Sequence, residues 1–181
     1  MASRNYIQDE VKVLSRGEAY LTPMKRHHID ELLEVLSKEN RRELKLLGYD
    51  DIKEALREMY ESSEVYIVRN KRKELVVAGG LWHEAGDEWP QMFAMFSENI
   101  KKDFNMLARG SKMLVNLFDQ AQHGMSMTIL SDYEFMMDWA EWLGFEAVGI
   151  SLDGSNKYVE FVRCNPNESN VYNSSSRPVT H

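Results

Sequence analysis

Side chains capable of acid–base chemistry stand together at His83 and Glu84, directly after the apolar stretch "LVVAGGLW" (75–82). A histidine or glutamate can take up a proton from a reacting group that lies within hydrogen-bond reach. Both residue types also occur at ordinary strand-end turns, which is the simpler interpretation. Tyr133 is a third titratable candidate, and Ser131 is close to it in the sequence. What these side chains can do depends on the strands and helices that carry them.

Other groupings of potential metal ligands and nucleophiles are weak. His27 and His28 stand near Asp30 and Glu31, but no further ligand follows at a suitable spacing. A solvated helix start, capped by an aspartate, is therefore the preferred interpretation of this group. Cys164 is the only cysteine, which excludes an intramolecular disulfide and a cysteine-rich zinc site. We expect neither a metal nor a thiol to carry the chemistry.

The composition predicts an acidic globular protein. Of the 181 residues, 43% are hydrophobic, and 29 acidic residues against 22 basic ones give a formal net charge of −7. This charge would repel phosphates and argues against a nucleic-acid-binding surface. The N-terminal segment "MASRNYIQDEVKV" has no long apolar run, and every apolar stretch is far shorter than the roughly 20 residues of a membrane helix. We expect a soluble, cytosolic protein that binds neither nucleic acid nor membrane.

The spacing of apolar residues predicts the secondary structure. Apolar residues three or four apart indicate amphipathic helices, and short β-branched runs bounded by turns indicate strands. The predicted helices cover residues 27–49, 50–64, 103–123 and 133–144, and the predicted strands cover residues 19–22, 65–70, 75–84, 91–97, 125–130, 145–151 and 157–164. The order β-α-α-β-β-β-α-β-α-β-β predicts an α/β sheet with helices on its faces.

Composition divides the chain into three parts. Residues 1–17 are polar and are predicted to form an N-terminal arm, residues 18–164 one α/β domain, and residues 165–181 a polar C-terminal tail. The tail is rich in serine and asparagine and cannot bury enough apolar surface to fold alone. A segment of this kind can become ordered by lying across a partner.

The stretch "DYEFMMDWAEWLGFEAVG" (132–149) concentrates aromatic residues at helical spacing. Phe135, Trp139 and Trp142 fall on one face of a predicted helix that Gly144 ends. Aromatic side chains mainly supply buried area, so packing in the core is the preferred interpretation of this face. Stacking of these rings against a ligand is the alternative.

The same stretch and the order of elements resemble one known family. The segment "DWAEWLGFEAVG" is similar to the last helix, the Leu-Gly-Phe motif and the following strand of the GCN5-related N-acetyltransferases, the GNAT fold. The segment from "HHIDELLEV" to "VVAGGLW" resembles a phage branch of that family, the acetyltransferase-like proteins of short-tailed phages, some of which are internal virion or assembly proteins. The resemblance covers residues 18–163. It implies a mixed, mostly antiparallel central sheet flanked by helices.

The resemblance also implies a place for acetyl-CoA. In the family, a glycine-rich loop before the long helix holds the pyrophosphate on main-chain N–H groups, and the coenzyme is cradled by main chain between the middle strands. Its candidate contacts in this chain would be Phe96, Ser97, Arg109, Gly110 and Lys112. Residues 98–108, however, contain no glycine. This departure argues against tight coenzyme binding and predicts that the protein has no cofactor, with acetyl-CoA as the alternative.

Catalytic roles follow only if the protein is an enzyme. The resemblance then implies that His83 or Glu84 is the base that deprotonates the acceptor amine, and that Tyr133 protonates the leaving group. Gly79 and Gly80 predict a bulge or a close approach of another backbone, which in the family lies beside the acceptor site.

Three functions remain open at this point. The preferred one is a non-catalytic GNAT-fold phage protein that docks on other phage or host proteins. Its expected location is the host cytoplasm or the virion, and a homo-oligomer or a ring is one form in which it could assemble. The alternative is an acetyl-CoA-dependent N-acetyltransferase acting on a small amine or a protein. An acidic inhibitor of a host defence factor is a third, weaker hypothesis.

Overall fold

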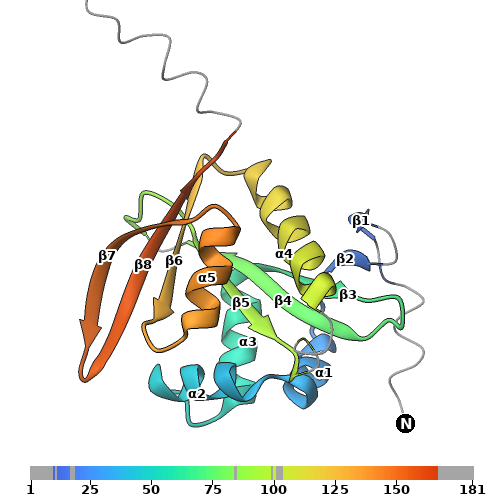
Figure 1. Ribbon diagram of the computed structural model, residues 1–181. Coiled ribbons are helices and arrows are strands. Elements are labelled where there is room, and N and C mark those ends of the chain that lie inside the picture. Colours follow the sequence, from blue (N-terminus) through green and yellow to red (C-terminus); the bar gives the residue numbers. More distant parts are fainter. Residues whose placement is uncertain are drawn as a thin grey trace, which may run out of the picture. The chain divides into compact units, whose positions relative to one another are not determined.

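The computed structural model (Figure 1) describes residue 10 and residues 12–16, 19–83, 85–98, 100 and 104–166. The helices are α1 (His28–Val35), α2 (Lys38–Leu46), α3 (Ile52–Ser62), α4 (Phe104–Asp119) and α5 (Glu134–Trp142). The strands are β1 (Leu14–Arg16), β2 (Ala19–Pro23), β3 (Ser63–Arg69), β4 (Leu75–Trp82), β5 (Gln91–Phe96), β6 (Gly124–Leu130), β7 (Glu146–Asp153) and β8 (Asn156–Cys164). No helix in these ranges is long and apolar enough to cross a membrane.

The strands form one sheet in the order β1-β2-β3-β4-β5-β6-β8-β7. β5 and β6 run parallel and pair at Gln91 and Ser126, whereas β1–β2, β2–β3, β3–β4, β6–β8 and β7–β8 are antiparallel. The predicted fold class, a mixed and mostly antiparallel sheet flanked by helices, is confirmed. β1 is a short edge strand within the segment 1–17 that the composition predicts as an arm.

Contacts within the chain define two compact units. The first comprises the described residues up to Trp82 together with Met92–Leu117, and the second comprises His83–Gln91 and the described residues from Phe118 onward. In the first unit, helices α1–α3 pack against β3 and β4 over a shared apolar core (Figure 1). This core consists of Met24, Ile29, Leu32, Leu36, Leu44, Ala55, Leu56, Val65, Ile67, Leu75, Ala78 and Met95.

Glycines allow close packing on these strands. A Cβ on Gly110 of α4 would lie 2.9 Å from Val68 Cγ1, so the helix approaches β3 where the side chain is absent. A Cβ on Gly80 would lie 2.8 Å from the main-chain oxygen of Glu64 and 2.5 Å from the ring of Phe93. The close backbone approach predicted for the glycine pair is therefore confirmed. The register shift between β3 and β4 lies at Val68 and Arg69 rather than at the glycines.

The single helix predicted over 27–49 is wrong. The chain leaves the helical conformation at Leu36 (φ −57°, ψ 131°), and α2 begins after Ser37 (φ −60°, ψ 154°). The Ser37 side chain accepts a hydrogen bond from the main-chain N–H of Asn40, which is the geometry of a helix N-cap. Two short helices thus replace one long helix, and the junction between them reaches β5.

The second unit contains β6, β8, β7 and α5. Gly144, with φ 87°, ends α5 as predicted, and the Arg163 guanidinium donates to the Leu143 main-chain oxygen at 2.8 Å. Trp139 is buried, which confirms core packing for one of the three aromatic rings. Phe135 and Trp142 keep 51% and 48% of their surface exposed, so the prediction that the whole face is core is wrong.

Candidate functional site

The segment that follows β5 is the expected coenzyme loop. Ser97 is fully buried, and its main-chain N–H donates to the oxygen of Val76 on β4 at 3.0 Å. The N–H of Ile100 donates to the oxygen of Ser97, also at 3.0 Å, so the chain turns tightly as it leaves the strand. Asn99 and residues 101–103 lie outside the described residues. The described part of this segment is therefore a single hydrogen-bonded turn.

The last residues of β5 are held by the junction between α1 and α2. The Asn40 side chain accepts a hydrogen bond from the Phe96 N–H at 2.8 Å and donates one to the Ala94 oxygen at 3.3 Å. The Ser37 N–H donates to the Phe96 oxygen at 2.8 Å. Ser37 and Asn40 are both buried. We call this set, Ser37 and Asn40 bound to the main chain of Ala94 and Phe96, the β5 clasp.

The β5 clasp covers one defined edge of the strand. In the sheet, β5 has β4 and β6 as neighbours. Because successive residues of a strand direct their main-chain groups to opposite edges, and Ser97 bonds to β4, the groups of Phe96 point to the other edge. The groups of Ala94, two residues earlier, share that edge. The clasp therefore occupies the main-chain N–H and C=O groups with which a ligand lying along this edge of β5 would have to form hydrogen bonds.

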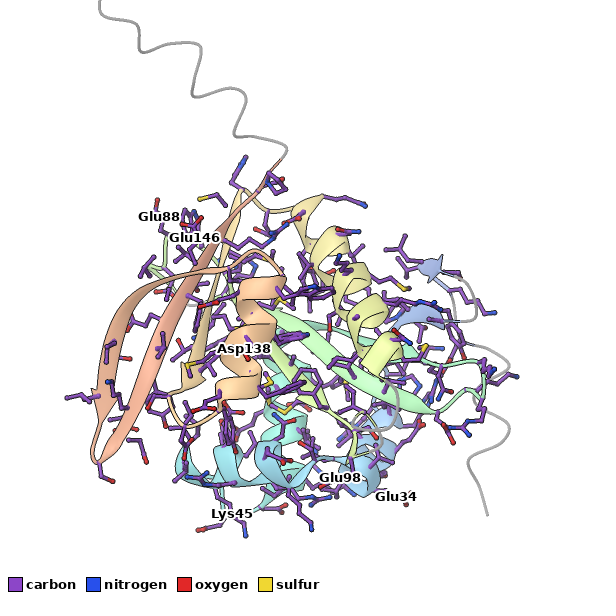
Figure 2. The ribbon with its side chains drawn as sticks, in the orientation of Figure 1. Glu34, Lys45, Glu88, Glu98, Asp138 and Glu146 are labelled. Carbon is purple, nitrogen blue, oxygen red and sulfur yellow. The ribbon has the colours of Figure 1, made fainter. Side chains whose placement is uncertain are left out.

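Local sequence explains why the clasp forms. Ser37 caps α2, and Asn40 is three residues later, the position from which a polar side chain reaches back over a helix start. The Ser37 hydroxyl also lies 3.0 Å from Asn40 Oδ1. Figure 2 labels Glu98, whose carboxylate accepts a hydrogen bond from the Lys38 N–H at 2.7 Å and so adds a second link between α2 and the end of β5. Burial raises the pKa of Glu43, although a hydrogen bond from Asn40 opposes that shift.

The other predicted coenzyme contacts lie along α4 rather than in a loop. Arg109, Gly110 and Lys112 are the sixth, seventh and ninth residues of this helix, which begins at Phe104. Arg109 and Lys112 are exposed, and Gly110 is buried against Val68. Main-chain N–H groups this far into a helix are used by intrahelical bonds. The basic side chains remain candidates for an anion contact, but packing accounts for Gly110.

The predicted catalytic residues belong to the second unit. His83 is exposed and follows the last residue of β4 directly. Tyr133 is half-buried at the start of α5, where its side chain makes no capping hydrogen bond. Glu84 lies outside the described residues. The roles of these three residues therefore stay predictions.

The most strongly buried charges of the first unit lie elsewhere. Arg69 on β3 has a side chain only 1% exposed and donates to both oxygens of Glu10, at 2.8 and 3.0 Å, and to both oxygens of Glu31, at 2.6 and 2.8 Å. Tyr20 donates to Glu10 at 2.8 Å. Burial alone would raise the pKa of Glu10, but the hydrogen bonds from Arg69 and Tyr20 outweigh it and lower the pKa. Burial and the bond to Glu10 raise the pKa of Tyr20 to about 12.

His28 completes this buried cluster, so the solvated helix start expected for this histidine is wrong. Its Nδ1 accepts the Lys25 N–H at 2.9 Å, so the neutral ring carries its proton on Nε2, which lies 3.1 Å from Glu10 Oε1. No group of three potential ligands suited to a metal ion occurs among the described residues. Burial lowers the pKa of His28 to about 4, and electrostatic interaction with His27 and Arg69 acts in the same direction.

The lowered pKa of His28 predicts a pH dependence of stability. The unfolded chain takes up this proton near pH 6.5 and the folded chain only near pH 4, so the free energy of unfolding should fall as the pH drops between these values. One such group changes it by at most about 1.4 kcal/mol per pH unit. Urea unfolding of His28→Gln should show a shallower dependence in this window. The exposed His83→Gln variant should keep the wild-type slope, and equal slopes for wild type and His28→Gln would contradict the assignment.

Sequence reasoning missed the residues that hold the site together. Ser37 and Asn40 lie inside what reads as one continuous amphipathic helix, and only the serine-to-asparagine spacing of three marks a new helix start. Glu10 is 59 residues away from Arg69, and nothing periodic connects them. For the clasp, the sequence signal was a polar residue flanked by apolar helical positions. For the buried ion pairs of Arg69 with Glu10 and Glu31, the sequence contains no such signal.

Several solved acetyltransferases, among them a GNAT-family protein from Bordetella pertussis, share this fold. No protein-family model matches the chain, and no curated protein matches it. A ribosomal-protein-S5-alanine acetyltransferase from Vibrio fischeri is 10% identical with a TM-score of 0.64, covering 87% of this chain and 98% of its own. A ribosomal L7/L12 α-N-protein acetyltransferase is 11% identical with a TM-score of 0.67, covering 86% and 94%. A variant of the spermidine N-acetyltransferase from Vibrio cholerae is 11% identical with a TM-score of 0.60, covering 87% and 99%. The chain has the GNAT fold.

Proposed function

We propose that this protein binds acetyl-CoA and transfers its acetyl group to an amine. The observation that carries the proposal is the extent of the fold match, since the solved acetyltransferases correspond over nearly their whole length. Two of these proteins acetylate ribosomal proteins and the third acetylates the polyamine spermidine. An amine on a small molecule or a protein is therefore the substrate class we propose.

The β5 clasp limits how the coenzyme could bind. The family cradle is made of main-chain groups at the middle strands, and here the groups of Ala94 and Phe96 are already bonded to Asn40 and Ser37. They do not fit a coenzyme while the clasp is closed. We expect binding to require that the clasp releases this edge.

A calorimetric titration of the full chain with acetyl-CoA tests the proposal. We expect saturable binding that is weak, in the high micromolar range or above, together with acetyl transfer to spermidine or to a peptide N-terminus, read as release of the free CoA thiol. If His83 is the base, His83→Ala should slow this transfer by roughly 100-fold without abolishing binding. No heat at millimolar acetyl-CoA and no thiol release would contradict the proposal.

A non-catalytic role is the second candidate, and the clasp is the observation that favours it. A GNAT-fold protein whose coenzyme edge is permanently closed would keep the scaffold and lose the reaction, and could then act as a docking protein in a virion or in its assembly. The resemblance to phage proteins is the only observation that suggests a role in a virion or in its assembly. Purification of phage particles followed by peptide identification would test it, since absence of this chain from every particle and complex contradicts the role.

A further inference from the structure

Glu43 on α2 is a half-buried carboxylate next to the β5 clasp. Its Oε2 atom accepts a hydrogen bond from the amide nitrogen of Asn40 at 3.3 Å. Burial raises the pKa of Glu43, and that hydrogen bond opposes the shift, but none of the described residues forms an ion pair with this carboxylate. A cation next to a buried carboxylate favours its charged form. A positively charged ligand would therefore find an unmatched charge at Glu43.

The amide nitrogen of Asn40 lies between two oxygen acceptors. It donates to Glu43 Oε2 and to the Ala94 main-chain oxygen, each at 3.3 Å. The orientation of this amide is fixed, because its oxygen accepts the Phe96 N–H at 2.8 Å and an N–H group can only donate. Both bonds from the nitrogen are longer than the usual length of about 2.9–3.0 Å. The two oxygens thus form a pair of acceptors that a neutral amide fills weakly.

We propose that, once Asn40 leaves β5, the acceptor amine binds in its ammonium form between the Glu43 carboxylate and the Ala94 oxygen. This role rests on the acetyl transfer proposed above and makes Glu43 the residue that selects a positively charged substrate. An ammonium group carries only donors, and its bond to a carboxylate is roughly twice as strong as a bond between neutral groups. It would therefore replace the Asn40 nitrogen with a charge-assisted bond to the same carboxylate. The net charge of −7 also attracts cationic substrates to the protein.

An ammonium at this position leaves a donor free for the acyl group. Departure of Asn40 also releases the Phe96 N–H, which shares one edge of β5 with the Ala94 oxygen. An N–H group suits an acyl oxygen and cannot bind an ammonium, whereas a main-chain oxygen suits an ammonium. The two released groups are therefore complementary to the two reactants, and both lie on the same short piece of strand. Holding two reactants close together is what a transfer between them requires.

Calorimetric titration of the full chain with spermidine, in the absence of coenzyme, tests the ammonium site directly. We expect the wild type to bind weakly and Asn40→Ala to bind roughly 10-fold more tightly, because the competing amide is gone. Glu43→Gln should weaken binding by roughly 10- to 100-fold in either background, the loss typical of a hydrogen bond to a charged group. The matched control is Glu141→Gln, at an exposed carboxylate of α5, which should bind as the wild type does. Equal affinities of Glu43→Gln and its parent, or binding by neither parent, would overturn the proposal.

The stability of Glu43→Gln separates a binding role from a structural one. Folding disfavours the charged form of Glu43, so replacing it with a neutral side chain of the same shape should leave the urea midpoint unchanged or raise it. A variant that keeps its stability but loses spermidine has lost a binding group. A marked fall in the urea midpoint would instead assign Glu43 to the packing of the fold and overturn the proposal.

Two measurements distinguish failure of this site from failure of the proposed acetyl transfer. In the transfer assay, Glu43→Gln should raise KM for spermidine with kcat nearly unchanged, and it should bind acetyl-CoA as the wild type does. Acetyl transfer whose KM does not depend on Glu43 would refute the ammonium site alone. Spermidine binding that depends on Glu43, without any binding of acetyl-CoA, would confirm the ammonium site and contradict the transfer.

Discussion

Replacing Arg69 with methionine should lower the free energy of unfolding by about 3–5 kcal/mol, the loss typical of removing one partner from a buried ion pair. The Arg69 side chain is 1% exposed and neutralises two carboxylates, Glu10 and Glu31. Without the guanidinium, Glu10 would stay buried as an uncompensated charge. The measurement is urea unfolding at neutral pH, followed by the intrinsic fluorescence of the four tryptophans.

Arg72→Met is the matched control for this prediction. Arg72 lies in the turn after the same strand and pairs with Glu74, but its side chain is 71% exposed. Exposed ion pairs contribute little, so we expect a change within about 0.5 kcal/mol. Similar losses for Arg69→Met and Arg72→Met would show that the buried cluster does not stabilise the fold.

A double variant separates loss of the pair from loss of packing. If the unpaired Glu10 charge causes the damage, Glu10→Gln combined with Arg69→Met should cost far less than the sum of the two single losses, because the second change removes the charge left behind. If the decreases in unfolding free energy of the two single variants add up, Arg69 stabilises the fold through the packing of its side chain instead.

Periodicity predicted those parts of the fold that are stabilised by local sequence. The helix Ile52–Ser62 lies within the range 50–64 that apolar residues three and four apart predict, although its cap is Asp51 and not the predicted Asp50. The Gly79–Gly80 pair marked a close backbone approach because only a residue without a side chain fits there. Such features can be predicted because the residues that signal each of them lie near one another in the sequence.

The candidate site was less predictable because its contacts are distant in sequence. Leu36 and Leu44 continue the apolar spacing across the break between α1 and α2, so the local pattern does not reveal this boundary. The boundary depends instead on hydrogen bonds from Asn40 to β5, to residues 54 and 56 positions further along the chain. In the same way, the exposed half of Trp142 continues a face whose spacing is that of a core helix. Helical spacing identifies an apolar face, but it does not show how much of that face the rest of the chain covers.

Asn40→Ala should tighten acetyl-CoA binding while it weakens the fold. The two hydrogen bonds between Asn40 and β5 contribute net stability of about 1–3 kcal/mol together, which the coenzyme must overcome to use the same main-chain groups. Removing them should therefore increase the affinity by roughly 10- to 100-fold. Calorimetric titration of the wild type and the variant measures this difference, and urea unfolding measures the accompanying loss of stability.

Two controls make the outcome specific to the β5 edge. Asn116→Ala removes an exposed asparagine of α4 and should leave the affinity unchanged. Hydrogen exchange should show the Phe96 amide exchanging faster in Asn40→Ala than in the wild type, and slowing again when acetyl-CoA is added, because the coenzyme replaces the lost acceptor. An affinity that is unchanged or lower in Asn40→Ala would mean that the coenzyme does not compete with Asn40 for this edge. Binding by neither protein would instead favour the docking role, since a weakened clasp would then fail to restore a site that the scaffold no longer contains.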